Sequence, residues 1–132
     1  MATRSSPCVY VVDDERIVTS TLTQILKRSG LTALGFVNPI DALRESEFSE
    51  PALLVSDVVM PNLTGIELAA EIRSKYPNCK ILLLSGESIT TDLLEADHSL
   101  ERDYVLLAKP IHPIQLIAMI ERLLKWQPCN SS

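Results

Sequence analysis

Five short runs of apolar residues recur along the chain, and longer segments with helical periodicity separate them. The runs are apolar at nearly every position, which is typical of strands buried on both faces of a parallel sheet. The predicted strands are CVYVV at 8–12, TALGFV at 32–37, ALLVS at 52–56, KILLLS at 80–85 and YVLLA at 104–108. Strands that alternate with helices in this way predict an α/β sandwich.

The segments around these strands predict five helices. The first ends before Gly30, the second begins after Asn38 with Pro39 at its first position, and Pro113 opens the last. The segment at 88–102 has the weakest periodicity and is the predicted fourth helix. The inward stripes of the first, third and last helices are Val18, Leu22, Ile25 and Leu26, then Leu68, Ala69 and Ile72, then Leu116, Ile117, Ile120, Leu123 and Leu124.

Composition narrows the class of protein. A chain of 132 residues, 46% of them hydrophobic, suits one domain with a single core. The net charge of −5 disfavours direct nucleic-acid binding, and no apolar run reaches the roughly 20 residues that span a membrane. The N-terminal MATRSSP lacks the apolar segment of a signal peptide. Cys8, Cys79 and Cys129 are far apart, so we expect reduced thiols and a cytoplasmic protein.

Polar residues stand at the carboxyl ends of four predicted strands. They are Asp13 and Asp14 after the first strand, Asp57 after the third, Ser85 at the end of the fourth and Lys109 after the fifth. In a parallel sheet these ends meet at one edge, where ligands bind. Crowded carboxylates call for a cation, and Mg²⁺ accepts oxygen ligands from one or two of them. Carboxylate, hydroxyl, metal and lysine are the groups used in phosphoryl transfer onto an aspartate.

Taken together, in this order and at this spacing, these motifs resemble those of the receiver domain of two-component response regulators. The matching stretches are Asp13-Asp14 after VYVV, SDVVMPNLTG around Asp57, Ser85-Gly86 after KILLL, and AKP at 108–110. The resemblance covers residues 7–126 and leaves 1–6 and 127–132 as flexible termini or a linker. It implies a flavodoxin-like, doubly wound, five-stranded parallel sheet of order 2-1-3-4-5, with five helices in a three-layer sandwich.

The resemblance also implies a role for each residue. Asp57 accepts a phosphoryl group from a sensor histidine kinase or a phosphotransfer protein, while Ser85 and Lys109 contact that group. The implied Mg²⁺ ligands are Asp13, Asp14, Asp57 and the backbone carbonyl of Val59. The domain then acts in a phosphorelay by switching its binding to a downstream effector or output domain, and its last two helices offer a surface for a phosphorylation-dependent homodimer. It catalyses only its own phosphorylation and dephosphorylation.

Some positions are specific to this chain. The aromatic residue that the family's switch places three before the lysine is Leu106 here, and Tyr104 lies on the same face of the strand as a partial substitute. Val59 is apolar and cannot align a hydrolytic water, whereas Glu87 can. The bond between Lys109 and Pro110 is often cis in the family, although trans is the ordinary form.

Three other functions fit part of the pattern. A pseudo-receiver would keep the fold and bind partners without phosphorylation, which Leu106 favours and the acids and lysine disfavour. A Mg²⁺-dependent phosphohydrolase would place its aspartyl nucleophile on the first strand, at Asp13. A nucleotide-binding flavodoxin-like protein would need a glycine-rich loop after the first strand, and this chain has none there. Asp13 and Asp14 would also serve as a plain helix cap.

Overall fold

The computed structural model describes residues 7–86 and 104–125, and within these ranges the chain forms five strands and four helices. They are β1 (Cys8–Val12), α1 (Arg16–Arg28), β2 (Thr32–Phe36), α2 (Pro39–Glu45), β3 (Leu53–Asp57), α3 (Gly65–Lys75), β4 (Lys80–Ser85), β5 (Val105–Ala108) and α5 (Pro113–Leu124). All five predicted strands are present, with ends that differ from the prediction by at most one residue. The predicted helix at 88–102 lies outside the described residues.

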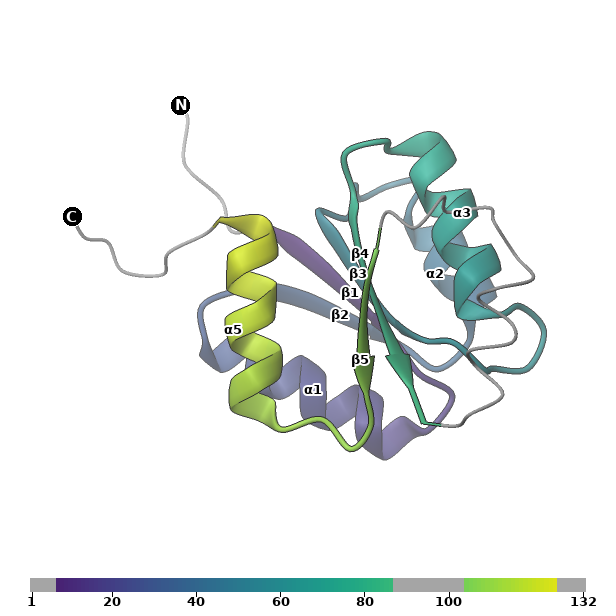
Figure 1. Ribbon diagram of the computed structural model, residues 1–132. Coiled ribbons are helices and arrows are strands. Elements are labelled where there is room, and N and C mark those ends of the chain that lie inside the picture. The colour runs from purple at the N-terminus through teal and green to yellow at the C-terminus, as the bar shows by residue number, and fades with distance from the viewer. Residues whose placement is uncertain (1–6, 87–103, 126–132) are drawn as a thin grey trace, which may run out of the picture.

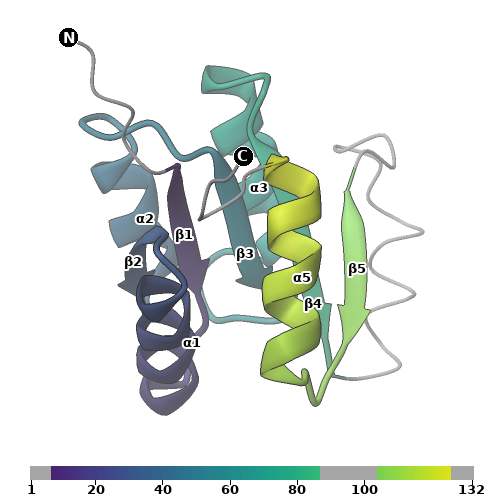
Figure 2. The same ribbon diagram turned by 90° about the vertical axis from the view of Figure 1, so that its left-hand side faces the viewer.

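The strands form one parallel sheet in the order β2-β1-β3-β4-β5, which confirms the predicted doubly wound topology. The order reverses at β1, because β1 pairs with β2 on one side and with β3 on the other. Because every pairing is parallel, all the arrowheads point the same way in Figure 2. The carboxyl ends of β1, β3, β4 and β5 therefore lie at one edge of the sheet, where parallel sheets of this kind bind ligands.

Helices cover both faces of the sheet (Figure 1). On one face α1 and α5 lie side by side, and α2 and α3 cover the other. The helical residues buried against the first face are Leu22, Leu26, Leu116 and Ile120. Those buried against the second face are Ala42, Ile66, Leu68, Ala69 and Ile72. The central strands are buried from both sides, as their unbroken apolar runs predict.

Local signals fix where the helices begin. The side chain of Asn38 accepts a hydrogen bond from the Ile40 N–H at 2.9 Å, and Pro39 opens α2 as predicted. At α3, Thr64 and Glu67 form a reciprocal capping box, with bonds of 2.9 and 3.1 Å. Within the described chain, α1 and α5 differ, because they begin after Glu15 and His112 without a side-chain cap. In α1 the first turn is held by other contacts, described below.

Two further expectations concern the described residues. Cys8 and Cys79 are free thiols, and Cys79 is buried, while Cys129 lies outside the described residues. In the part of the chain that the structure describes, no helix has both the length and the apolar character to cross a membrane.

Candidate functional site

Three carboxylates come together at the carboxyl edge of the sheet. Asp13 and Asp14 follow β1, and Asp57 is the last residue of β3. One oxygen from each carboxylate lies within 4.8 Å of the other two. Asp13 is 1% exposed, Asp57 is half-buried and Asp14 is exposed, so the cluster opens to solvent on the Asp14 side. The predicted meeting of these acids is present in the structure.

Lys109 joins two of the three acids. Its Nζ lies 3.0 Å from Asp13 Oδ2 and 3.0 Å from Asp57 Oδ2. The residue directly follows β5, and its backbone N–H donates to the Ser85 carbonyl at 2.8 Å, so Lys109 is placed by the pairing of β4 with β5. The peptide bond to Pro110 is cis. Side chains from after β1, from β3 and from after β5 thus meet in one cluster.

Burial and charge act in opposite directions on these groups. Burial raises the pKa of Asp57, the Lys109 ammonium lowers it and the charge of Asp13 raises it, and the pKa ends above its ordinary value. Burial alone would lower the pKa of Lys109, but its bonds to Asp57 and Asp13 outweigh burial and leave it raised. Lys109 therefore remains a cation, and three carboxylates with one ammonium carry a formal charge of −2.

The donor set fits a hard divalent cation. Its atoms are carboxylate oxygens, and the charge of −2 is the charge that a divalent ion neutralises. The three oxygens lie within 4.8 Å of one another, so they surround a common space in which a divalent ion could be held. Asp13, Asp14 and Asp57 are the side chains able to hold such an ion.

The loop after Asp57 is packed tightly against the strand that precedes it. The Gly65 N–H donates to the Val58 carbonyl at 2.8 Å, and a β-carbon on Gly65 would lie 2.2 Å from the Asp57 carbonyl oxygen. Met60 is buried, whereas Val59 is 45% exposed and its backbone N–H donates to the Asp57 carboxylate. The loop thus fixes the Asp57 backbone and leaves Val59 at the mouth of the site.

The residues predicted to form the switch are less tightly grouped. Ser85 ends β4, one position beyond the residue that pairs with Asp57, and its own partner on β5 is Ala108. Leu106 is 42% exposed on the edge strand. Tyr104 precedes β5 and packs against the core on the α3 side of the sheet. Glu87 lies outside the described residues.

Thr19 contacts the site but did not stand out in the sequence. It is buried on α1, and its hydroxyl donates to the Asp13 carbonyl at 2.8 Å. The available signal was weak, because a single threonine beside the apolar stripe of a helix ordinarily faces solvent.

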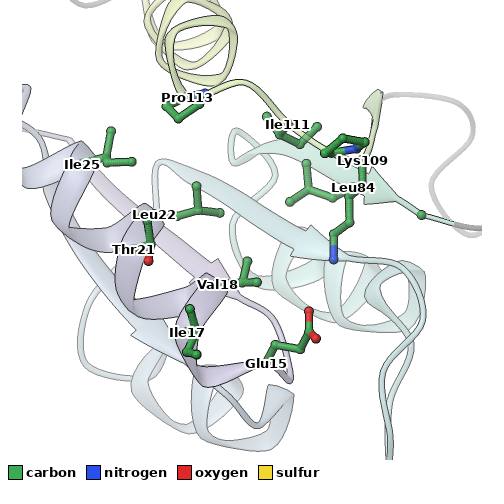
Figure 3. Close-up of a pocket in the computed structure, with 12 residues that line it drawn as sticks. Glu15, Ile17, Val18, Thr21, Leu22, Ile25, Leu84, Lys109, Ile111 and Pro113 are labelled. Atoms are coloured by element: carbon green, nitrogen blue, oxygen red, sulfur yellow. The ribbon is translucent and has the colours of Figure 1, made fainter.

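A cavity of about 580 Å³ lies beside the cluster, between α1 and the connection from β5 to α5 (Figure 3). Its walls are mainly apolar, and Glu15 and Lys109 are its charged residues. The apolar lining residues from α1, β4, the β5–α5 connection and the start of α5 are Ile17, Val18, Leu22, Ile25, Leu84, Pro110, Ile111 and Pro113. The cavity therefore shares Lys109 with the acidic cluster.

Comparisons with known proteins agree with this geometry. The family model of the response regulator receiver domain matches residues 9–121. The chain is 29% identical over 116 residues to the response regulator receiver protein CpdR of Brucella abortus, covering 88% of this chain and 95% of CpdR. It is also 29% identical over 114 residues to the DNA-binding transcriptional regulator NtrC of Proteus hauseri, covering 86% of this chain.

The chain spans only 24% of the length of that NtrC. Among solved structures, the receiver domain of the Francisella response regulator 1452 superposes with a TM-score of 0.75 at 27% identity, covering 91% of this chain and 98% of that one. The family match extends over most of the chain, and the fold and sheet order agree with it. The chain belongs to the response regulator receiver domain family, the signalling domains of two-component systems.

Proposed function

We propose that Asp57 accepts a phosphoryl group from the phosphohistidine of a sensor histidine kinase or phosphotransfer protein, in a reaction that requires Mg²⁺. The observation that carries this proposal is the position of the Lys109 ammonium, 3.0 Å from both Asp57 and Asp13 at the point where three carboxylates converge. One fixed cation beside an acidic cluster is the arrangement that binds a phosphoryl group together with a divalent ion.

In the proposed reaction, a carboxylate oxygen of Asp57 forms a bond to phosphorus as the bond from phosphorus to the histidine nitrogen breaks. The electron pair of the phosphorus–nitrogen bond leaves with the imidazole of the histidine. When bound, Mg²⁺ supplies positive charge to the phosphoryl oxygens. Asp13, Asp14 and the Val59 carbonyl hold the ion with Asp57. Lys109 then pairs with a phosphoryl oxygen, and the Ser85 hydroxyl donates to another.

Two features support Asp57 over Asp13 as the nucleophile. Asp13 is 1% exposed, and its Oδ1 already accepts the Glu15 N–H at 2.9 Å. The Asp57 side chain is 14% exposed and ends a strand whose following loop leaves the site open at Val59. A phosphorylated donor therefore reaches Asp57 more readily. This difference disfavours the phosphohydrolase alternative, in which Asp13 would react.

We assign this phosphoacceptor unit to residues 7–126 and place its activity in the cytoplasm, where the free thiols of Cys8 and Cys79 persist. The apolar cavity beside Lys109 offers the donor protein a contact surface next to the reacting group. Phosphorylation adds charge and acceptor oxygens, which change the surface offered to an effector, an output domain or a second copy of the chain. Catalysis is limited to the domain's own phosphorylation and dephosphorylation.

A second candidate is the pseudo-receiver, which binds partners without phosphorylation. The exposed Leu106 favours it, because a leucine provides no aromatic ring to follow a movement of Ser85. The bonds of Lys109 to Asp57 and Asp13 favour the phosphoacceptor. Tyr104, packed on the core beside β5, is our candidate for the missing aromatic residue.

The test is the intact mass of the protein after incubation with acetyl phosphate, with and without Mg²⁺, alongside Asp57→Asn. We expect the gain of one phosphoryl group, dependent on Mg²⁺ and absent from the variant. A folded protein that binds Mg²⁺ but gains no mass would support the pseudo-receiver. A gain that persists in Asp57→Asn and disappears in Asp13→Asn would support the phosphohydrolase.

A further inference from the structure

Asp13 is held by hydrogen bonds at three of its atoms. Its N–H donates to the Phe36 carbonyl at 3.1 Å, its carbonyl accepts the Thr19 hydroxyl at 2.8 Å and its Oδ1 accepts the Glu15 N–H at 2.9 Å. The remaining oxygen, Oδ2, lies 3.0 Å from Lys109 Nζ. The surrounding chain therefore fixes the backbone and one oxygen of Asp13 and directs the other oxygen into the cluster.

The Thr19 bond differs from the other two because it comes from a side chain. The bonds to Phe36 and Glu15 use backbone groups that any residue at those positions would supply. Thr19 also donates its backbone N–H to the Glu15 carbonyl at 3.1 Å, as an ordinary helical bond. Within the described chain, α1 begins without a side-chain cap, so the Thr19 hydroxyl ties the start of this helix to Asp13.

The packing of α1 on β2 fixes the orientation of Thr19. A β-carbon on Gly35 would lie 2.6 Å from Thr19 Cγ2 and 2.7 Å from Thr23 Oγ1, so the helix approaches the strand at a distance that only glycine allows. A β-branched side chain has few χ1 rotamers. With its methyl group against Gly35, the Thr19 side chain presents its hydroxyl to the Asp13 carbonyl.

We propose that Thr19 is a positioning residue for the divalent cation: its hydroxyl fixes Asp13 so that Oδ2 is presented to the ion. The inference rests on the proposed function of the acidic cluster. Without the hydroxyl, the buried Asp13 carbonyl loses its partner and must turn toward another donor, which displaces the carboxylate. Groups that orient metal ligands commonly change affinity by about 10- to 100-fold when removed. We expect a loss of about tenfold here, because Asp13 keeps its bonds to Phe36, Glu15 and Lys109.

The test measures the dissociation constant for Mg²⁺ by calorimetry on the whole chain, at one pH, for the wild type, Thr19→Val and Thr23→Val. Thr23→Val is the matched control, because the Thr23 hydroxyl donates to the Thr19 carbonyl at 2.6 Å on the same helix. We expect Thr19→Val to raise the dissociation constant about tenfold and Thr23→Val to leave it unchanged. At saturating Mg²⁺, phosphorylation of Thr19→Val by acetyl phosphate should return toward the wild-type rate.

Thr19→Ser and Thr19→Ala give a second comparison in case Thr19→Val does not fold. Both variants lack the methyl group that packs on Gly35, and they differ only in the hydroxyl. The serine variant should bind Mg²⁺ more tightly than the alanine variant by about tenfold. Equal affinities in this pair, or equal losses in Thr19→Val and Thr23→Val, would overturn the positioning role alone. A wild-type protein that does not bind Mg²⁺ would overturn the proposed function as well.

Discussion

Gly65 lies so close to Asp57 that a β-carbon at position 65 would stand 2.2 Å from the Asp57 carbonyl oxygen. The atom in the way belongs to the backbone of β3, so a side-chain rotation cannot relieve the collision. The glycine therefore lets α3 start directly beneath the strand that carries Asp57.

Gly65→Ala should consequently destabilise the fold by about 1–3 kcal/mol, the usual cost of forcing an extra methyl group into a packed site. Urea denaturation measures this loss. Gly86→Ala is the control, because a β-carbon there would lie 3.5 Å from Lys109 Cδ, which is an ordinary contact. If both variants unfolded at the same urea concentration, the close approach at Gly65 would not matter for stability.

Asp57→Asn should raise the melting temperature of the metal-free protein at neutral pH. The pKa of Asp57 is raised in the folded chain, chiefly by burial, so the folded state binds that proton more tightly than the unfolded state does. This group therefore favours folding when protonated, and the contribution is lost as the pH rises through its folded pKa. Asparagine stays neutral and avoids the loss.

The pH profile checks the sign of this effect. The difference in melting temperature between Asp57→Asn and the wild type should shrink as the pH falls through the pKa of Asp57, which lies above its ordinary value of 3.8. Adding Mg²⁺ at 100 times its dissociation constant should stabilise the wild type by about 2.7 kcal/mol and the variant by less. A difference that grew on acidification would contradict the raised pKa.

Lys109→Met should raise the pKa of Asp57 further in the metal-free protein. The ammonium lowers that pKa through a hydrogen bond and through its charge, and its removal leaves burial and the charge of Asp13 opposed only by the hydrogen bond from the Val59 N–H. The carboxyl ¹³C shift of Asp57, followed by NMR against pH, reports the change. Lys80→Met is the control, because Lys80 is exposed at the opposite end of β4. An unshifted Asp57 titration in Lys109→Met would show that the lysine does not act on it.

Gly35→Ala should weaken Mg²⁺ binding, although Gly35 lies on β2 and is not one of the three acidic residues. Its new β-carbon would press on Thr19 Cγ2, 2.6 Å away, and move the hydroxyl that holds Asp13. Adding Thr19→Ser removes that methyl group and keeps the hydroxyl. The double variant should therefore bind Mg²⁺ more tightly than Gly35→Ala alone in the same calorimetric titration. Additive losses in the two variants would contradict this coupling.

Val59→Asn should shorten the lifetime of the phosphorylated protein. Val59 is 45% exposed beside Asp57, and a valine offers no group that orients a water molecule for attack. An amide at the same position supplies both a donor and an acceptor. Loss of the phosphoryl group can be followed by mass after removal of acetyl phosphate, with Val59→Ala as the apolar control. Equal decay in all three proteins would exclude a role for this position.

Sequence patterns predicted the sheet well, because burial on both faces leaves unbroken apolar runs and polar residues mark where each run stops. Asp57 shows the limit of this rule. The predicted range of the third strand stops at Ser56 with Asp57 at its end, whereas the backbone of Asp57 belongs to β3 and pairs with Leu84. The strand continues past the apolar run because the pairing with β4 continues, and this pairing depends on a partner distant in sequence.

The orientation of α1 was predicted less well. Leu22 and Leu26 are buried as predicted and Val18 packs against the core, but Ile25 is only half-buried and Thr19, which was not predicted, is buried. Gly35 explains the difference, because the close approach of α1 to β2 turns Thr19 inward. Hydrophobic periodicity on one helix cannot contain this information, since it depends on a missing side chain on another element.

The bonds of Lys109 to both Asp13 and Asp57 also depend on side-chain placement that a sequence does not specify. Charge and spacing predicted that these residues would share one edge of the sheet. They left open whether the lysine would contact one acid, both or solvent. That choice follows from the pairing of β5 with β4, which is a tertiary feature.

Lys109 also connects two strands of the sheet that do not pair with each other, β5 and β3. Within the described chain, β5 pairs only with β4, so a displacement at the end of β3 would ordinarily have to travel through β4 to reach the outer strand. The Lys109 side chain extends past β4 and donates a hydrogen bond to Asp57 at the end of β3. A change of charge at Asp57 would therefore act directly on Lys109, and through it on β5 and the segment that leads into α5.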